Sequence, residues 1–245
     1  MIHHSQSFPS LSINENRREY KLVELIRSTN LIIQQLCLLF LVIALHQVLL
    51  LELCSSQVLM VVGVLLFIIA SPSKLLSSVL LLSFLAGLSP ILKTLTRTIS
   101  TDSIYYMASI LYFLNLLLKS YTIRKGIQLK DGFSINAGFC GSVLLASRLN
   151  ATTQVFNLLQ LSVSMLCFIP YFTISVDSAI FHKCMTTLLL CCTLCIWTVL
   201  NDSIAWLIIG LVVFISGISP LLFLYLQRYK TVMNGPWDEP TILDN

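Results

Sequence analysis

The sequence predicts an all-α integral membrane protein, a polytopic helix bundle, and its composition and hydropathy pattern carry this prediction. Of its 245 residues 56% are hydrophobic and only 11% are charged, with a mean hydropathy of +0.87, whereas soluble domains carry about 25% charged residues. The apolar residues gather in stretches of the length that spans a membrane, roughly 20 residues each. This composition excludes a water-soluble globular enzyme and leaves no room for a separate catalytic domain of ~100 residues.

Eight apolar stretches follow one another along the chain and predict about eight transmembrane helices. They are residues 31–51, 53–70, 75–92, 104–118, 134–149, 155–174, 184–200 and 204–226. Little more than Glu52 separates the first two, and the fourth and fifth are short, so seven spans or a re-entrant segment remain alternatives. The predicted domains are a cytosolic polar and amphipathic arm at 1–30, a transmembrane bundle at 31–226 and a cytosolic tail at 227–245.

The basic residues indicate the orientation, because Lys and Arg gather on the cytoplasmic side of short loops. With eight spans and a cytosolic N-terminus, 12 of the 15 Lys and Arg fall on the cytosolic side, and only Lys93, Arg97 and Arg148 fall opposite. Both termini are therefore predicted to be cytosolic. Residues 20–27 have the pattern of a short amphipathic surface helix, with a plain extension of the first span as an equal alternative.

The motifs of the commoner enzymes do not occur in this sequence, neither a glycine-rich nucleotide loop nor a zinc-protease or nucleophile-elbow signature. The acids beside the membrane core do not pair with another acid or a His at short spacing, as a metal or a hydroxyl-activating base would require. They are Glu52, Asp102, Asp131, Asp177 and Asp202. We therefore expect no catalytic residue, no metal and no cofactor in this chain, and we expect no internal repeat.

Polar residues inside the apolar stretches are costly in a membrane and need partners. The predicted role of four amides, at Gln34, Gln35, Asn157 and Gln160, is to hydrogen-bond between helices. His46 is expected to be satisfied by its surroundings rather than to act as a ligand.

The densest polar cluster is SPILKTLTRTISTDSIYY at 89–106, in which Pro90 breaks a helix and two cations and several hydroxyls follow. Arg and Lys donate charge-assisted hydrogen bonds to phosphate, so the cluster is a candidate site for an anionic lipid headgroup. The alternative is an ordinary interfacial helix capped by Ser or Thr. The candidate residues are Lys93, Thr94, Thr96, Arg97, Ser100 and Asp102.

A second cluster, SINAGFCGSVLLASRL at 134–149, lines a helix with small residues that allow close helix packing. Asn136 and Arg148 join the candidate polar site, with Arg148 either reaching to headgroups or pairing with Asp102. The third feature is the tail LQRYKTVMNGPWDEP at 226–240, a candidate partner-docking segment in which Trp237 is alternatively an interface anchor. Its candidate residues are Gln227, Tyr229, Lys230, Gly235, Pro236, Trp237, Asp238 and Glu239.

These blocks together resemble the PIG-C family, the multi-span subunit of the glycosylphosphatidylinositol (GPI) N-acetylglucosaminyltransferase complex. SPILKTLTRTISTDSIY, SINA with SVLLASRL, LQRYK with NGPWDE, and LIIQQLC at 31–37 follow in the family's order from about residue 31 to 239. The chain departs from the family in residues 1–30, where the usual Tyr-x-x-Gln and Asp-Asn-Tyr are missing, and at Pro240, where the family more often has Ala.

The resemblance implies a subunit of the endoplasmic reticulum complex that transfers N-acetylglucosamine from UDP-GlcNAc to phosphatidylinositol on the cytosolic face, the first step of GPI-anchor biosynthesis. It implies a PIG-A-like catalytic partner and the PIG-H, PIG-P, PIG-Q and PIG-Y subunits, with this chain non-catalytic. We expect it to act as a scaffold and to present phosphatidylinositol, although the predicted topology places Lys93, Arg97 and Arg148 on the luminal side. The alternatives are a polytopic transporter or lipid scramblase, or an integral-membrane enzyme in its own right.

Overall fold

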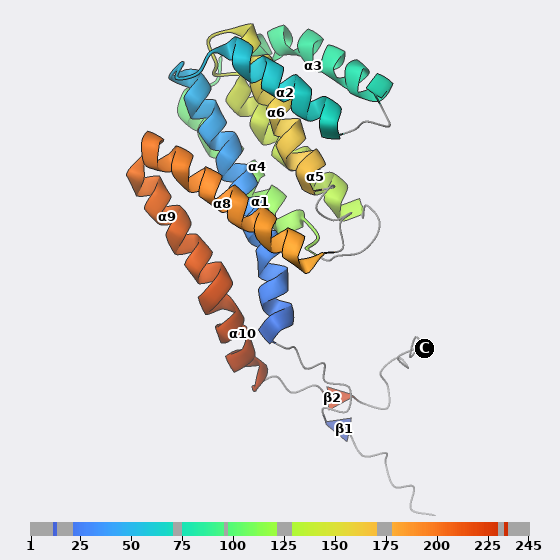
Figure 1. Ribbon diagram of the computed structural model, residues 1–245, viewed down its shortest axis with the longest axis vertical. Helices are drawn as coiled ribbons and strands as arrows, with labels where there is room; N and C mark the ends of the chain where they lie inside the picture. The colour runs from blue at the N-terminus through green and yellow to red at the C-terminus, as the bar shows by residue number, and fades with distance from the viewer. Residues whose placement is uncertain are drawn as a thin grey trace, which may run out of the picture.

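The computed structural model describes residues 12–13, 22–70, 75–95, 98–121, 129–170, 178–229 and 233–234. Within these residues the regular structure is helical, apart from one pair of two-residue strands (Figure 1). The elements are β1 (Ser12–Ile13), α1 (Leu22–Leu50), α2 (Ser56–Ala70), α3 (Leu75–Leu95), α4 (Thr101–Leu118), α5 (Leu129–Ala146), α6 (Thr152–Val163), η2 (Ser164–Phe168), α8 (Ala179–Leu200), α9 (Asp202–Val213), η3 (Phe214–Ile218), α10 (Ser219–Gln227) and β2 (Met233–Asn234).

The eight predicted apolar stretches fall mainly on these helices, which confirms the helical fold. Within the described residues, three helical segments are long and apolar enough to cross a membrane, namely Ser28–Leu50, Ile180–Leu200 and Asp202–Gln227. Shorter apolar helices are Ser56–Leu65 and Leu80–Ile91. α2 has only 15 residues, and α6 carries Gln154, Asn157 and Gln160 within 12 residues. Several helices are therefore shorter or more polar than the predicted transmembrane helices. α1 runs unbroken from Leu22, so the first helix extends into the predicted arm.

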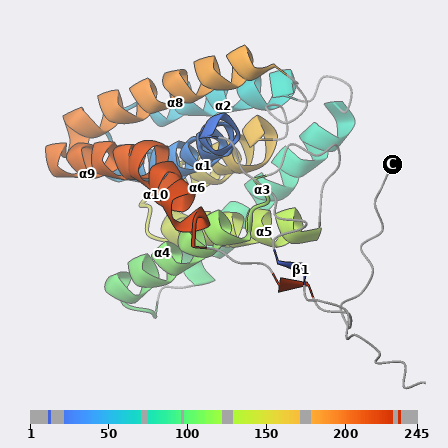
Figure 2. The ribbon, with the colours of Figure 1, turned by 90° about the horizontal axis from the view of Figure 1, so that it is seen from below.

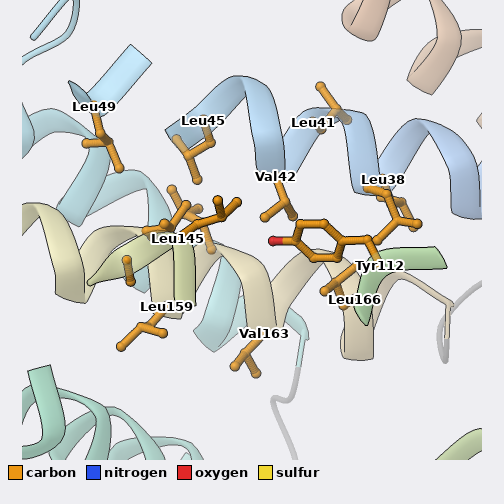
Figure 3. Close-up of a cluster of buried hydrophobic side chains, with 14 of the residues drawn as sticks. Leu38, Leu41, Val42, Leu45, Leu49, Tyr112, Leu145, Leu159, Val163 and Leu166 are labelled. Atoms are coloured by element: carbon orange, nitrogen blue, oxygen red, sulfur yellow. The ribbon is translucent and has the colours of Figure 1, made fainter. Parts of the chain in front are cut away.

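α1 and α6 lie at the centre of the bundle. From Gln154 to Val163 nearly every residue of α6 is buried, because α1, α2, α3 and α5 all pack around it. Figure 3 shows Val42 and Leu45 of α1 facing Tyr112 of α4 and Leu145 of α5 across this core. α6 is thus buried on all sides, and its amides Gln154, Asn157 and Gln160 stand three residues apart along one face.

Close packing of α4 against α5 depends on glycines that face the partner helix. A Cβ atom at Gly138 would lie 2.7 Å from Nδ2 of Asn115, and one at Gly141 would lie 3.0 Å from Cε1 of Tyr112. Small residues let two backbones approach in a membrane. The predicted small-residue stretch therefore packs closely against a neighbouring helix, as expected.

The turn between α1 and α2 is tight and uses a left-handed residue. Glu52 has φ 54, the one non-glycine residue with positive φ in the described part of the chain, a conformation that costs a non-glycine residue energy. Gln154 of α6 holds this turn, because its Nε2 donates to the Leu49 carbonyl at 3.1 Å and lies 3.5 Å from Oε1 of Glu52. The polar residues of the buried helix thus fix the loop that aims α2.

α8 and α9 form a helical hairpin whose corner is a single residue. Asn201 closes α8 by donating its backbone N–H to the Trp197 carbonyl, and its side chain caps α9 by accepting from the Ser203 N–H at 3.0 Å. Trp197 then ties the hairpin to α1, because its indole Nε1 donates to the Phe40 carbonyl at 3.2 Å. The turn needs no connecting residues beyond Asn201.

Two π-helical segments, η2 and η3, stand just before prolines. Ile169, which precedes Pro170, donates its N–H to the Ser164 carbonyl, and Ser219, which precedes Pro220, donates to the Phe214 carbonyl. Proline lacks an N–H and crowds the carbonyl four residues earlier. A local shift to hydrogen bonds between residues five apart lets the helix continue past the proline. Both segments pack against α1.

The chain segments before α1 and after α10 lie at the same end of the molecule. β1 and β2 pair antiparallel, with Ser12 opposite Asn234 and Ile13 opposite Met233. Figure 1 shows this ladder below the start of α1 and the end of α10, and Figure 2 shows the same end of the molecule from below.

Many large apolar side chains point away from the bundle. On α4 they include Tyr106, Phe113 and Leu117, and on α9 to α10 they include Trp206 and Leu221. A soluble protein rarely exposes apolar surface on this scale, so the outer faces are those of a protein that meets lipid.

Replacing Gly138 by Ala is expected to destabilise the bundle by about 1–3 kcal/mol, the usual cost of overpacking. Asn115 cannot yield cheaply, because hydrogen bonds to two other helices hold its side chain. The matched control is Gly132→Ala on the same helix, where a Cβ would meet no atom within 4 Å. Thermal unfolding of the detergent-solubilised protein measures both, and equal midpoints for the two variants would contradict the packing argument.

Candidate functional site

The predicted polar cluster lies where α3 gives way to α4. Ser100 caps α4, since its Oγ accepts from the Ser103 N–H at 3.4 Å and lies 2.7 Å from the Ser103 hydroxyl. Asp102 follows, exposed, in the first turn of α4. The structure thus shows the serine cap that was the alternative for this segment.

The remaining cluster residues are partly outside the described region. Lys93 and Thr94 belong to the last turn of α3, and their side chains are not described; Thr96 and Arg97 lie outside the described residues. Arg148 lies in the turn just after α5, and its Nη2 donates to the Ile99 carbonyl at 2.7 Å. The fold therefore brings Arg148 beside the 98–103 segment.

Asn136 is not part of this assembly. It is exposed on α5, ten residues before the end of that helix at Ala146, which corresponds to about 15 Å along the helix axis. In the tail, Gln227 is the last residue of α10, and the exposed Tyr229 places its hydroxyl 3.1 Å from that of Tyr225. The other predicted docking residues lie outside the described residues: Lys230, Gly235, Pro236, Trp237, Asp238 and Glu239.

A buried chain of polar side chains joins three helices in the interior. Gln35 of α1 donates through Nε2 to Oδ1 of Asn115 on α4 at 2.6 Å. Asn115 donates through Nδ2 to the Ser134 carbonyl of α5 at 2.7 Å, and the Ser134 hydroxyl returns a bond to the Asn115 carbonyl at 2.7 Å. Each polar atom that leaves water here meets a partner, as a buried amide requires.

Lys119, the C-terminal cap of α4, is the last member of this hydrogen-bonded network. Its ammonium group donates to Oε1 of Gln35. Burial lowers the pKa of Lys119 to about 8, and the nearby Asp131 and Cys167 partly offset that effect. Asp131 in turn accepts from the backbone N–H of Ser120 at 3.0 Å and from its hydroxyl at 2.8 Å. Asp131 of α5 therefore holds Ser120, which directly follows the cap of α4, beside the buried amides.

Three of the four predicted interhelical amides find partners on other helices. Besides Gln35, Gln34 donates to the Thr186 hydroxyl of α8 at 2.8 Å and to the His182 carbonyl at 3.0 Å, and Asn157 donates to the Ser56 carbonyl of α2 at 2.8 Å. Gln160 departs from the prediction: it is fully buried, and neither its Oε1 nor its Nε2 has a hydrogen-bond partner within the described residues. Its Nε2 faces Gly63 of α2.

His46 is buried, and its Nε2 has no hydrogen-bond partner within the described residues, so its surroundings satisfy it only in part. It hydrogen-bonds the backbone of Leu145 and packs edge-on against Tyr105, with 5.9 Å between ring centroids.

Sequence reasoning missed Asn115 and Lys119 as members of one network. The available signal was an Asn inside a strongly apolar run, YFLNLLLK, with the cation one turn further along the same helix face. Residues four apart lie on one face, so the pair pointed to a polar contact on that face. Its partner, Gln35, is 80 residues away, and the sequence does not reveal that pairing.

Taken together, the fold and its interior define a helical membrane protein in which buried amides join the central helices. A family model described as GPI2, phosphatidylinositol N-acetylglucosaminyltransferase, matches residues 3–238. The chain therefore belongs to this family, which confirms the resemblance drawn from the sequence blocks. The match also includes most of the N-terminal arm, which had been set apart as divergent.

Named relatives agree with the family. The chain is 37% identical over 168 residues to a phosphatidylinositol N-acetylglucosaminyltransferase GPI2 subunit from Schizosaccharomyces pombe, covering 66% of this chain and 52% of the relative. It is 33% identical over 177 residues to a putative subunit of the same transferase from Dictyostelium discoideum, covering 70% and 51%. A human subunit of this transferase is 29% identical over 175 residues, covering 71% and 59%. The matched region thus spans about half the length of these relatives. No solved structure matches the chain.

Replacing Asn115 by Ala is expected to destabilise the fold by about 1–3 kcal/mol, because it takes the side-chain partner from the buried Gln35 amide and from the Ser134 carbonyl. The matched control is Asn136→Ala, an exposed amide on α5 that should change little. Thermal unfolding in detergent compares the two. A similar midpoint for both variants would show that the polar chain does not hold α1, α4 and α5 together.

Proposed function

We propose that this chain is a non-catalytic membrane subunit of the complex that transfers N-acetylglucosamine from UDP-GlcNAc to phosphatidylinositol, the first step of GPI-anchor biosynthesis. The observation that carries the proposal is the family match across residues 3–238, together with relatives that are themselves named as subunits. In this role the chain works in the endoplasmic reticulum membrane as a scaffold and presents the lipid acceptor.

The non-catalytic role is supported by what the acidic side chains do. Asp131 holds the start of α5 to Ser120, and Glu52 lies beside Gln154 in the turn before α2. Asp102 and Asp202 occupy the first turns of α4 and α9, where a carboxylate favours the helix dipole. Each of these acids thus has a structural position, and the glycosyl transfer belongs to a PIG-A-like partner.

Eight spans with both termini in the cytosol is the topology that we propose. The β1–β2 pairing supports it, because segments before the first helix and after the last can meet only when the number of crossings is even. The positive-inside distribution of Lys and Arg then selects the cytosolic side. The bundle at 31–226 is flanked in this arrangement by an arm at 1–30 and a tail at 227–245.

The tail is the proposed docking segment for the other subunits, PIG-A-like, PIG-H, PIG-P, PIG-Q and PIG-Y. Its residues from Gln227 to Glu239 combine cations, a Gly-Pro turn and Trp237 with two acids. Such a short, mixed-charge segment with an aromatic anchor suits protein recognition.

Phosphatidylinositol presentation is the proposed role of the segment from Lys93 to Asp102 with Arg148. The contact between Arg148 and the Ile99 carbonyl supports it by bringing a third cation to this segment. The second candidate function, a transporter or lipid scramblase, is favoured by the unpartnered amide of Gln160 in the middle of a buried helix, where polar groups often mark a substrate path.

Affinity purification of the full chain from microsomes in mild detergent tests the subunit role. We expect a glycosyltransferase subunit to co-purify and the eluate to transfer N-acetylglucosamine from UDP-GlcNAc to phosphatidylinositol. Removing residues 230–245, which leaves α10 intact, should abolish co-purification and activity together. A chain that purifies alone, or that is active by itself, would contradict the proposal.

The double substitution Lys93→Ala and Arg97→Ala is expected to raise the KM for phosphatidylinositol about tenfold or more, since each lost charge-assisted hydrogen bond is worth about 1.5–3 kcal/mol. Co-purification of the partner subunits should not change. Unchanged KM and assembly would remove the headgroup role from this segment and leave it the structural role of a helix cap.

A further inference from the structure

The pairing of β1 with β2 joins the segment before α1 to the segment after α10 in one small sheet. Ser12 stands opposite Asn234 and Ile13 opposite Met233, so each strand contributes two residues to an antiparallel ladder. Within the described residues the sheet has no third strand, and Figure 1 shows it outside the bundle. An isolated pair of strands is marginally stable at best in water. A ladder this short therefore needs further support.

The neighbouring sequence prevents the ladder from gaining that support by growing longer. Continued in the same register beyond Asn234, it would bring Pro236 opposite Ser10, and proline lacks the N–H that a ladder bond requires. Continued toward the helices, it would bring Arg18 opposite Arg228, and like charges directly opposite each other destabilise a strand pair. The sheet can therefore grow only sideways, by the addition of another strand.

Both outer edges of the sheet are open within the described part of the chain. An edge strand presents unpaired backbone N–H and C=O groups, which are a template for another strand. In β-strand addition, an extended segment of a second protein pairs with such an edge through main-chain hydrogen bonds. The ladder alternates a polar pair, Ser12 with Asn234, and an apolar pair, Ile13 with Met233. Because opposite residues share a face of a sheet, the segment that fits also alternates polar and apolar residues.

The position of β2 in the chain indicates what supplies this segment. β2 lies within the tail at 227–239, which is the proposed docking segment for other subunits, and β1 lies in the arm at 1–30. The family model runs from residue 3 to residue 238, so it includes both strands. The proposed topology places both strands in the cytosol. The occupant is therefore a cytosolic protein segment, since a lipid offers no backbone to pair with the open edge.

We propose that the arm and the tail form one docking unit, in which the β1–β2 pair fixes the tail and an extended cytosolic segment of another subunit adds to the open edge of β2. The inference rests on the proposed function for the identity of the partner as a subunit of the complex. It gives the arm a role of its own. β1 orders part of the tail before the partner arrives, so less backbone entropy is lost on binding.

A deletion confined to the arm tests this role with the tail left intact. A chain that lacks residues 2–16 has no β1, and we expect it to recover about tenfold less of the partner subunits in affinity purification from microsomes. That change corresponds to about 1.4 kcal/mol. The matched control lacks residues 2–10 and keeps β1, so its recovery should equal that of the full chain. Equal recovery by the two deletions would overturn the proposal.

Paired cysteines test the ladder inside the assembled complex. Ser12→Cys with Asn234→Cys places two thiols at opposite positions, where a disulfide fits. Ser12→Cys with Met233→Cys is the control, because neighbouring residues of a strand point to opposite faces. Mild oxidation of microsomes should join the first pair about tenfold more than the second, and peptide mass spectrometry separates this bond from bonds to the eight native cysteines. Equal joining of both pairs would contradict the register and the docking unit with it.

Hydrogen exchange measures the third strand directly. The backbone amides of β1 and β2 should exchange about tenfold more slowly in the purified complex than in the full chain expressed and purified without its partners, because strand addition completes their ladder. One peptide of a partner subunit should slow with them. Unchanged exchange of β1 and β2 on assembly would overturn strand addition, whatever other surface the partner covers.

The two proposals fail in different ways. Partner recovery that is lost without residues 230–245 but complete without residues 2–16 would contradict the docking unit and leave the tail its docking role. A full chain that recovers no partner subunit would contradict the proposed function and this inference together.

Discussion

The hydrogen-bonded chain from Gln35 through Asn115 to Ser134 is the constraint on which the arrangement of the bundle depends. Apolar side chains alone do not fix how helices pack in a bilayer, because lipid tails satisfy them as well as another helix does. Polar contacts and close backbone approach supply the missing specificity. These hydrogen bonds tie α1, α4 and α5 together. Gly138 lets the α5 backbone approach Asn115, whose side-chain amide makes the bonds. Register and distance are thus set by one residue, Asn115.

α6 shows the same principle and its limit. Gln154 and Asn157 reach the carbonyls of Leu49 and Ser56, so the buried helix holds both sides of the turn between α1 and α2. One helical turn after Asn157, Gln160 faces Gly63 without a partner within the described residues. The amides therefore fix the start of α2. Its middle is held by close packing instead, because a Cβ atom at Gly63 would lie 2.5 Å from Nε2 of Gln160.

The sequence predicted the helices well, because apolar stretches and their polar boundaries are local properties. It also identified Gln34, Gln35 and Asn157 as bonds between helices, since a buried amide must find a partner. It did not identify Asn115 as the partner of Gln35. The two residues are 80 positions apart, and their contact depends on which faces of α1 and α4 pack together. The prediction for Gln160 was wrong for the same reason. The serine cap at Ser100 was foreseen only as an alternative, since Ser and Thr serve headgroups and helix ends equally well.

One nine-residue motif occurs twice, as FLAGLSPIL at 84–92 and FISGISPLL at 214–222, which corrects the expectation that the sequence has no internal repeat. It was missed because no periodic pattern joins copies that are 130 residues apart and only nine residues long. The first copy lies within α3 as ordinary α-helix, whereas the second runs through the π-helical η3 into α10. A Ser-Pro pair in a helix therefore does not by itself decide whether a π-helical turn forms. The two copies differ in their surroundings, because η3 packs against α1 whereas α3 packs mainly against α6, so the geometry around the proline depends on the packing of each helix.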